Sequence, residues 1–394
     1  MRSSQTFHPP TRLLLGPGPS NADDRVLRAM SAPVVGYFDP VMLEIMADIQ
    51  RLLQLVFGTA HKAFPISGTG TSGMEAALAN LLEPGEPVAI GVNGFFGDRM
   101  RQVAERAGAR PVVMEAEWGR PIEAEQVEDA FKREAGLQVV ALVHAETSTG
   151  VLQPLEEIHE IVRSHDAFLL LDAVTSLGGH PVEVDRHGVD LCYSGTQKAL
   201  SAPPGLAPIA VSPRTAARIR ARRHPVQSFY LDLALFEQYW GTAKFYHHTP
   251  PVSFYYALLE ALRIVEEEGL QARFDRHRQN QAALVAGLEA MGLQMHVAPA
   301  HRLWTLTTVR IPEAANDAAV RRRLLTEFGI EIGGGLGALL GKVWRIGLMG
   351  KNACPANVLL FLTALERVLQ AEGVPCGSGT RAADHIYRKA GSPA

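Results

Sequence analysis

The 394-residue sequence predicts an α/β fold, with a large domain around a mostly parallel, helix-covered sheet of seven strands and a smaller C-terminal α+β domain. The first observation is an alternation of short apolar runs with longer helical patterns up to about residue 212, which is typical of parallel β/α units. The second is that several short runs are apolar at nearly every position, as expected when helices cover both faces of a sheet. The third is a change near residue 255, where two long helical patterns replace the alternation.

Seven apolar runs supply the predicted strands of the large sheet, and each has the length of a strand. They are Phe64–Ile66, Val88–Val92, Val112–Met114, Val139–Val143, Phe168–Leu171, Leu191–Ser194 and Ile209–Val211. A helix is predicted to open at Ser72, where Ser72 and Glu75 form an S-x-x-E capping box, and to stop at Glu83-Pro84-Gly85.

The C-terminal elements follow in a different order. They are helices at Tyr255–Glu268 and Ala272–Met291, a strand-rich run at Trp304–Ile311, a helix at Asp317–Phe328, a strand ending in Trp344-Arg345-Ile346, and a helix at Pro355–Leu369. The glycine-rich stretch from Gly333 to Gly341 is interpreted as a mobile loop. We therefore expect an N-terminal segment (1–20), a large domain (21–268), a small domain (269–370) and a loosely ordered tail (371–394).

Composition excludes several classes of protein. The net charge of −3 is too balanced for a main partner such as nucleic acid or an anionic membrane. The three cysteines, Cys192, Cys354 and Cys376, are too widely spaced for a disulfide framework or a structural zinc site. No run approaches the roughly 20 apolar residues of a membrane span, and the first residues lack a signal-peptide core. We expect a cytoplasmic protein that acts on small molecules.

The turn Ser67–Gly73 joins a predicted strand to a predicted helix. A glycine-rich turn at a helix N-terminus presents N–H groups to an anion, and a phosphate is the natural guest. Its glycines also spell G-x-G-x-x-G, so an NAD-dependent dehydrogenase is the alternative from a different class. The acidic residue that should end the next strand is absent, since Asn93-Gly94 stands there, and this argues against a dehydrogenase.

Asp172 closes an apolar strand, which places it at the carboxyl edge of the sheet, where open α/β folds bind ligands. Lys198 follows the next strand and reaches the same edge. A carboxylate and an amine beside a phosphate-binding turn are what pyridoxal phosphate requires, because the lysine binds its aldehyde and the carboxylate keeps its ring nitrogen protonated. For either residue alone, an ordinary ion pair is the simpler interpretation, and it is the combination that favours the cofactor.

With these motifs, the sequence resembles the class V, fold type I pyridoxal-phosphate aminotransferases, and most closely the alanine–glyoxylate (serine–pyruvate) group. The resemblance runs from Leu13 to about Leu369. Its signatures are LLLGPGPSN (13–21), STGVLQPL (148–155), YSGTQKALSAPPG (193–205), YHHTP (246–250) and WRIGLMG (344–350). It implies a ping-pong transfer of an amino group from a small L-amino acid, alanine or serine, to glyoxylate or pyruvate. It also implies a homodimer in which the second subunit completes the cofactor site.

The resemblance assigns roles around the cofactor ring. Lys198 is the Schiff-base lysine and the base that moves the substrate's Cα proton, and Asp172 is the partner of the ring nitrogen. Val174 covers one face of the ring and Phe96 the other, although close relatives carry tryptophan where Phe96 stands. Thr147 bonds the region of the 3′-oxygen.

Further roles concern the cofactor phosphate and the substrate. Thr69, Gly70 and Thr71 hold the phosphate with help from Gln197, and Thr71 stands where the best-known relative has histidine. Two more residues, Tyr246 and Thr249, reach the phosphate of the other subunit's cofactor. Arg345 clamps the substrate's α-carboxylate, since a planar guanidinium matches a carboxylate in a two-point fork.

Other activities share this fold. Class V transaminases with aminoethylphosphonate, ureidoglycine or pyridoxamine as donor share most of these motifs and stay open as alternatives. A cysteine desulfurase or lyase requires a reactive cysteine on a loop, whereas Cys354 directly precedes Pro355, as at a helix start. The adjacent His247 and His248 lack a third ligand at readable spacing, so no metal site is expected.

Overall fold

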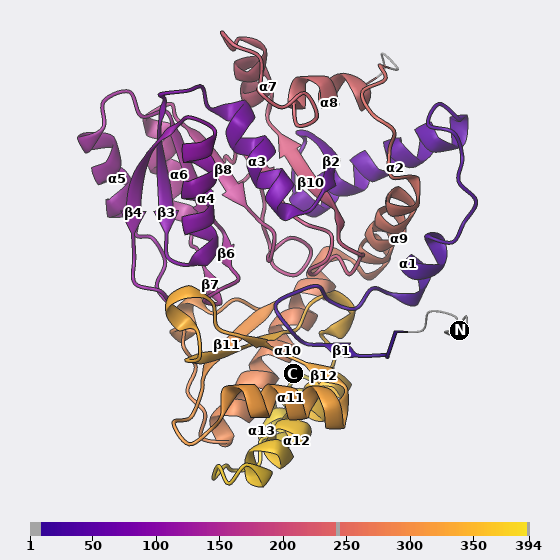
Figure 1. Cartoon of the computed structure of the whole chain (residues 1–394), viewed down its shortest axis with the longest axis vertical. Helices are drawn as coiled ribbons and strands as arrows, with labels where there is room; N and C mark the ends of the chain where they lie inside the picture. Colours follow the sequence, from indigo (N-terminus) through magenta and orange to yellow (C-terminus); the bar gives the residue numbers. More distant parts are fainter. Residues whose placement is uncertain (1–8, 242–244, 392–394) are drawn as a thin grey trace, which may run out of the picture.

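The computed structural model describes residues 9–241 and 245–391, and the chain forms two packed parts (Figure 1). The upper part contains the large sheet, and the lower part contains the C-terminal elements. Each part has its own apolar core: one draws on residues between Met42 and Val265, and the other on Leu15 and residues between Ala283 and Ala383. Within the described residues, no helix combines the length and the apolar character that a membrane crossing requires.

The large sheet has seven strands in the order β2-β10-β9-β8-β5-β3-β4. Their bounds are β2 Lys62–Gly68, β3 Pro87–Val92, β4 Arg110–Glu115, β5 Val139–Val143, β8 Phe168–Asp172, β9 Leu191–Tyr193 and β10 Gly205–Val211. Only β10 runs antiparallel to its neighbours, β2 and β9, and the other pairs are parallel. The predicted seven-stranded, mostly parallel sheet is therefore confirmed.

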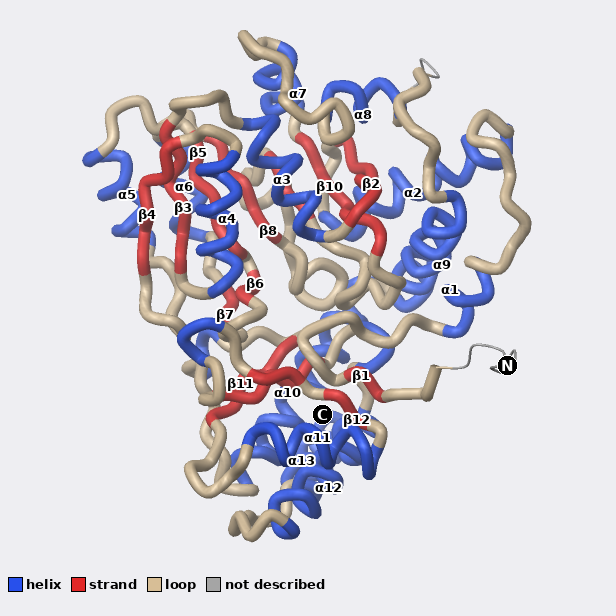
Figure 2. The backbone as a smooth tube through the Cα atoms, viewed as in Figure 1, coloured by secondary structure: helices blue, strands red, loops and turns tan. Residues whose placement is uncertain are grey.

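Helices pack against this sheet and against one another around it (Figure 2). They are α1 Asp24–Ala29, α2 Pro40–Phe57, α3 Gly70–Leu81, α4 Phe95–Arg106, α5 Ala124–Arg133, α6 Glu156–Ser164, α7 Pro213–Arg220, α8 Leu233–Tyr239 and α9 Val252–Glu268. Every residue of the interior strand β5 is buried, which explains why its sequence is apolar throughout. A short hairpin, β6 Ala145–Glu146 and β7 Val151–Leu152, follows β5.

Helix α3 begins two residues earlier than predicted, and the predicted capping box is absent. Thr69 occupies the N-cap position, and the hydroxyl of Ser72 donates to the Thr69 carbonyl at 2.7 Å. Because Ser72 already lies in the first turn of the helix, its hydroxyl bonds back to a nearby carbonyl instead of accepting from a backbone N–H. Glu75 is exposed on the helix surface.

The lower part is built on a three-stranded antiparallel sheet in the order β11-β14-β13. Its elements are α10 Leu270–Ala290, β11 Leu306–Arg310, α11 Asp317–Phe328, β12 Ile330–Glu331, β13 Gly333–Gly334, β14 Val343–Gly347, α12 Pro355–Ala371 and α13 Thr380–Gly391. The first strand of the chain, β1 (Leu13–Leu14), pairs in parallel with β12 and so belongs to this part. Trp344 of β14 is fully buried in its core.

The interpretation of Gly333 to Gly341 as a mobile loop is wrong. Gly333 and Gly334 form β13 and pair with Arg345 and Trp344 of β14, and a 3-10 turn follows at Gly337–Leu339. Glycine is required at position 333, because a Cβ there would lie 2.5 Å from the Cδ of Pro17.

The expectation of a loosely ordered tail after Ala371 is also wrong, since residues 380–391 form helix α13. This helix packs against α10 and α12. Ala383 is fully buried, and the hydroxyl of Tyr387 donates to Oδ1 of the buried Asn280 at 2.8 Å. The helix was not predicted because the Gly-Ser-Gly run before it gives the tail the composition of a loop, although the residues of the helix itself are amphipathic.

We predict that Ala383→Asp detaches α13, because an unpaired carboxylate in an apolar core costs several kcal/mol. Arg381→Asp is the matched control, since Arg381 is exposed on the same helix. Scanning fluorimetry and limited proteolysis should show a lower melting temperature and cleavage near residue 379 for Ala383→Asp only. Equal behaviour of the two variants would contradict the packing described for α13.

Candidate active site

A cavity of about 220 Å³ opens at the carboxyl edge of the large sheet and gathers most of the residues predicted for the site. Its lining is Thr69, Gly70, Thr71, Met74, Phe96, Arg99, Val143, Ala145, Thr147, Asp172, Val174, Gln197 and Lys198. Of the predicted residues, only Tyr246, Thr249 and Arg345 are absent from this lining. Segments far apart in the sequence therefore meet at one sheet edge, as the strand order requires.

Lys198 follows β9, and its side chain is only 8% exposed. Its Nζ donates to the carbonyl oxygen of Pro17, and a Cβ at Gly18 would lie 2.7 Å from that nitrogen, so the N-terminal segment closes over the amine. Burial, reinforced by the nearby positive charge of Arg345, lowers the pKa of Lys198 to about 8. A useful fraction of the amine is therefore neutral near physiological pH.

Asp172 is the last residue of β8 and is almost completely buried. Its Oδ1 accepts from the backbone N–H of Val174, and its Oδ2 accepts from the hydroxyl of Tyr193, both at 2.8 Å. Burial raises the pKa of Asp172 to about 6, although the two hydrogen bonds favour the ionised form. The carboxylate is thus held in one orientation and is still mostly ionised at pH 7.

The turn before α3 has hydrogen-bond donors that could bind a ligand, and a buried acceptor with no partner in the described part of the chain lies beside it. The side chain of Thr69, at the N-cap, makes no capping bond, and the first N–H groups of any helix have no intrahelical acceptor. Gly70 allows a close approach to β8, because a Cβ there would lie 2.8 Å from Cγ2 of Val174. Oε1 of Gln197 is buried without a hydrogen-bond partner among the described residues.

Glu146 is a buried acid that the sequence analysis missed. Its Oε2 accepts from the backbone N–H groups of Phe96 and Gly97 at 3.1 Å, and its Oε1 accepts from the N–H and the hydroxyl of Ser148. A carboxylate at the N-terminus of α4 is stabilised there by the helix dipole, and it fixes the backbone that carries Phe96. The sequence feature that could have revealed Glu146 is the presence of an acidic residue in an otherwise uncharged run, directly before Thr147.

Arg345 comes from β14 of the lower part and is 5% exposed. Its Nε donates to the carbonyl of Gly334 at 2.8 Å, and its Nη1 donates to the carbonyl of Thr147 at 3.1 Å. Burial lowers the pKa of Arg345 to about 10, so it stays cationic at neutral pH. The bond to Thr147 ties this cation to the cavity wall, and no carboxylate of the described residues forms an ion pair with it.

The hydroxyl of Thr147 shares a hydrogen bond with the hydroxyl of Thr175. A hydroxyl can donate one hydrogen bond and accept two, so this bond leaves Thr147 able to contact the 3′-oxygen, and its predicted role stays a prediction.

Arg99 is a second residue that the sequence analysis missed. It lies on α4, three residues after Phe96, and lines the cavity beside the α3 turn. Its Nη1 donates to the hydroxyl of Thr71 at 3.2 Å. Its guanidinium carbon lies 4.9 Å from the centroid of the Phe96 ring and 5.0 Å from that of Phe95. The signal available was its spacing of three residues from Phe96, the distance at which two side chains of a helix are neighbours.

Tyr246 and Thr249 do not reach the cavity of their own chain. The two hydroxyl groups lie 3.0 Å apart, and the Tyr246 ring is 5.0 Å from that of Tyr37. Between them, Nδ1 of His247 and Nδ1 of His248 lie 2.8 Å apart. Among the described residues, no group of three or more His, Cys, Asp or Glu side chains is arranged to hold a metal ion.

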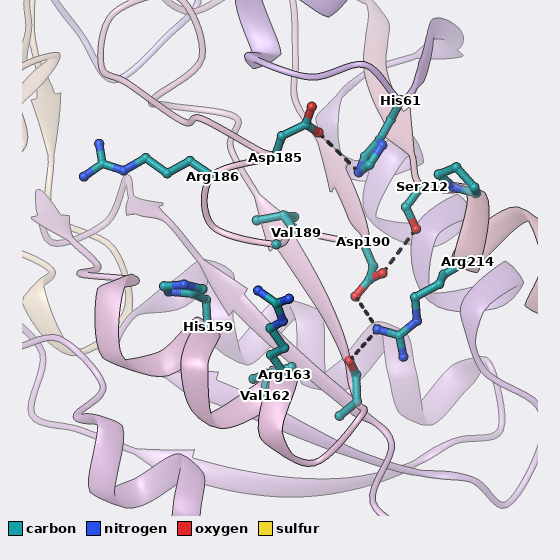
Figure 3. Close-up of a pocket in the computed structure, with 13 residues that line it drawn as sticks. His61, His159, Val162, Arg163, Asp185, Arg186, Val189, Asp190, Ser212 and Arg214 are labelled. Atoms are coloured by element: carbon teal, nitrogen blue, oxygen red, sulfur yellow. Dashed lines mark hydrogen bonds and ion pairs between the residues drawn. The ribbon is translucent and has the colours of Figure 1, made fainter.

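A second cavity, of about 470 Å³, is larger but lies at the opposite edge of the sheet (Figure 3). It is bordered by residues that precede β8 and β9, whereas Asp172 ends β8. Two close side-chain contacts lie within it: His61 is 3.5 Å from Asp185, and Arg214 is 3.8 Å from Asp190. It holds none of the predicted site residues, so size alone does not identify the site.

The sequence profile of the family Aminotransferase class-V matches residues 38–352. The chain therefore belongs to the class-V aminotransferase family, and the predicted family and enzyme class are confirmed.

Individual relatives span nearly the whole chain. Alanine–glyoxylate aminotransferase of Oryctolagus cuniculus is 42% identical over 366 residues, 92% of this chain and 93% of that protein. The crystal structure of ureidoglycine–glyoxylate aminotransferase from Bacillus subtilis has a TM-score of 0.95 at 42% identity, covering 97% of this chain and 99% of that one. Alanine–glyoxylate aminotransferase from Nostoc sp. has a TM-score of 0.90 at 48% identity, covering 92% and 96%.

We predict that Arg345→Gln shifts the titration of Lys198 to higher pH. The positive charge of Arg345 disfavours the protonated amine, so its removal should raise the pKa of Lys198 above about 8. Competitive labelling with acetic anhydride, read by mass spectrometry of the Lys198 peptide, reports the neutral amine as a function of pH. Arg310→Gln, at an exposed position of β11 in the same small sheet, is the control and should leave the midpoint in place. An unchanged midpoint in Arg345→Gln would show that the two charges are not coupled.

Proposed function

We propose that this protein is a pyridoxal-phosphate-dependent aminotransferase that moves an amino group from a small L-amino acid, alanine or serine, to glyoxylate or pyruvate. The observation that carries the proposal is one cavity that contains the buried amine of Lys198, the buried carboxylate of Asp172 and the N-terminus of α3. Family membership supports the same chemistry.

The residues of the cavity fit this cofactor. The hydroxyl of Thr69 and the first N–H groups of α3 supply donors for a phosphate. Val174 and Phe96 supply apolar surfaces for the two faces of a ring. Asp172 supplies a fixed carboxylate for the ring nitrogen.

When bound, pyridoxal phosphate supplies an aldehyde that reacts with amines and a protonated ring that withdraws electrons from the carbon next to the substrate nitrogen. Lys198 would bind the aldehyde at rest and, once freed, would take the proton from the substrate's Cα and deliver it to the cofactor carbon C4′. A general base is most effective when its pKa lies near the working pH, and burial brings the pKa of Lys198 to about 8. Asp172 holds a proton on the ring nitrogen.

Arg345 binds the α-carboxylate of the substrate. Its remaining N–H groups are free of any described carboxylate, and its burial excludes the water that would weaken an ion pair. A single guanidinium at this position favours substrates with one carboxylate, which is the basis for proposing alanine or serine with glyoxylate or pyruvate.

We infer that the active form is a homodimer. Exposed aromatic side chains include Phe38, Phe229, Tyr230 and Tyr246. Ring contacts join Phe38 and Tyr246 through Tyr37, and Phe229 and Tyr230 through His247, and the two groups meet where Tyr246 and His247 are adjacent in the chain. A second copy covering this surface would bring Tyr246 and Thr249 to the neighbouring cavity, which they do not reach in their own chain.

Two alternatives differ in their support. A ureidoglycine donor is supported by the Bacillus subtilis relative, whose identity to this chain is close to that of the alanine–glyoxylate enzymes. A cysteine desulfurase has less support, because Cys354 is the N-cap residue of α12 and does not lie on a loop over the cavity.

The activity is tested by absorption spectroscopy of the purified protein. We expect a yellow protein whose visible band is lost when a small L-amino acid is added and restored by glyoxylate or pyruvate. Lys198→Ala should retain cofactor and lose turnover by at least about 1,000-fold, because it lacks the base. Running the same half-reaction with alanine, serine and ureidoglycine ranks the donors. A colourless protein that does not respond to added cofactor would exclude the proposal.

The role of Arg345 is tested by steady-state kinetics. Arg345→Gln should raise KM for every amino donor by about tenfold or more, the loss expected when a charged hydrogen bond is removed. The KM of Arg345→Lys should lie between those of the wild type and Arg345→Gln, because an ammonium group offers a point charge without the planar fork. Arg310→Gln is the control and should keep the normal KM. If KM is unchanged in Arg345→Gln, the carboxylate is bound elsewhere.

A further inference from the structure

None of the residues assigned so far to the phosphate carries a full positive charge. Thr69, Gly70, Thr71 and Gln197 are neutral, and a helix N-terminus counts for roughly half a charge. A phosphate monoester carries about −1.5 to −2 charges at pH 7. Lys198 is committed to the aldehyde and cannot also neutralise the phosphate. The site as assigned therefore leaves most of this negative charge without a counter-charge.

Arg99 is placed to supply the missing charge. It lines the cavity next to the α3 turn, and its bond to Thr71 attaches it to a residue assigned to the phosphate. It is half-buried, and the two phenylalanine rings beneath it hold its flat guanidinium group.

The ion pairing of Arg99 differs from that of its neighbour on the same helix. Arg101 forms ion pairs with Asp98 and Glu105, at 2.8 and 2.7 Å. Among the described residues, no carboxylate lies within ion-pair distance of Arg99. A part-buried guanidinium that contacts only a hydroxyl and two rings keeps N–H donors for an anion.

We propose that Arg99 is the cationic phosphate-binding residue of this site. The inference rests on the proposed function, because its ligand is the phosphate group of pyridoxal phosphate. Its charge then faces the phosphate, while the rings of Phe95 and Phe96 hold the guanidinium group in place. The bond from Nη1 also orients the Thr71 hydroxyl, which makes Thr71 and Arg99 a single binding unit.

The competing explanation is that Arg99 only packs on Phe95 and Phe96, and so affects cofactor binding by positioning these two rings. The two explanations differ in what they predict for pyridoxal, which has the ring and the aldehyde but no phosphate. A charge partner for the phosphate affects the binding of pyridoxal phosphate alone. A packing residue affects both molecules equally.

The experiment measures the dissociation constants of pyridoxal phosphate and of pyridoxal by absorbance titration of the apoprotein. For Arg99→Gln we expect about 10- to 100-fold weaker binding of pyridoxal phosphate, as for the loss of a charge-assisted hydrogen bond. Binding of pyridoxal should change by less than about threefold. Arg99→Lys should recover part of the loss, and Arg101→Gln, the matched control on α4, should bind both like the wild type.

Each further outcome is decisive. Equal weakening of both molecules by Arg99→Gln, or wild-type affinity for pyridoxal phosphate, would overturn the inference. Thermal melting of each apoprotein separates a local effect from unfolding, and Arg99→Lys keeps the test valid if the glutamine variant does not fold. If the wild-type protein itself fails to bind pyridoxal phosphate, the proposed function fails first and removes the ligand on which this inference depends.

Discussion

The structure depends on the burial of charged groups around one cavity. Lys198, Asp172, Glu146 and Arg345 are each at most 8% exposed, and a buried charge is costly unless hydrogen bonds or an opposite charge compensate for it. Much of the local architecture supplies that compensation: the Tyr193 hydroxyl for Asp172, the first N–H groups of α4 for Glu146, and backbone carbonyls for both cations. The compensation is incomplete for Lys198 and Arg345, because neither cation forms an ion pair with a carboxylate of the described residues.

The compensation comes from both packed parts of the chain. Asp172 and Lys198 belong to the large sheet, whereas Arg345 is carried by β14 of the small one. The bond from Arg345 to the Thr147 carbonyl crosses between them. Any change in how the two parts pack therefore changes the distance between the guanidinium group of Arg345 and the amine of Lys198, so the packing of the two parts also sets the geometry of the site.

The sequence was sufficient for the elements whose patterns are local. The seven strands are apolar runs, and the edge positions of Asp172 and Lys198 follow from parallel topology. Tertiary contacts decided the rest. Glu146 and Arg99 matter through partners 49 and 28 positions away, at Gly97 and Thr71, which no local pattern contains. Two-residue strands such as β1 and β12 are too short to show a period, and α13 was hidden by the glycine and serine residues before it.

The N-terminal segment has a consequence for how the chain acquires its structure during synthesis. Arg12 donates to the carbonyl of Leu325, 313 positions later, and β1 pairs only with β12. The large sheet can assemble while the ribosome is still translating, because its strands end at Val211. The segment that covers Lys198 already has partners in the large part, since the hydroxyl of Ser20 donates to the carbonyls of Gln197 and Lys198, but its second anchor, β12, is made only in the last quarter of the chain. In a nascent chain, the segment over the site therefore gains its full set of contacts only late in synthesis.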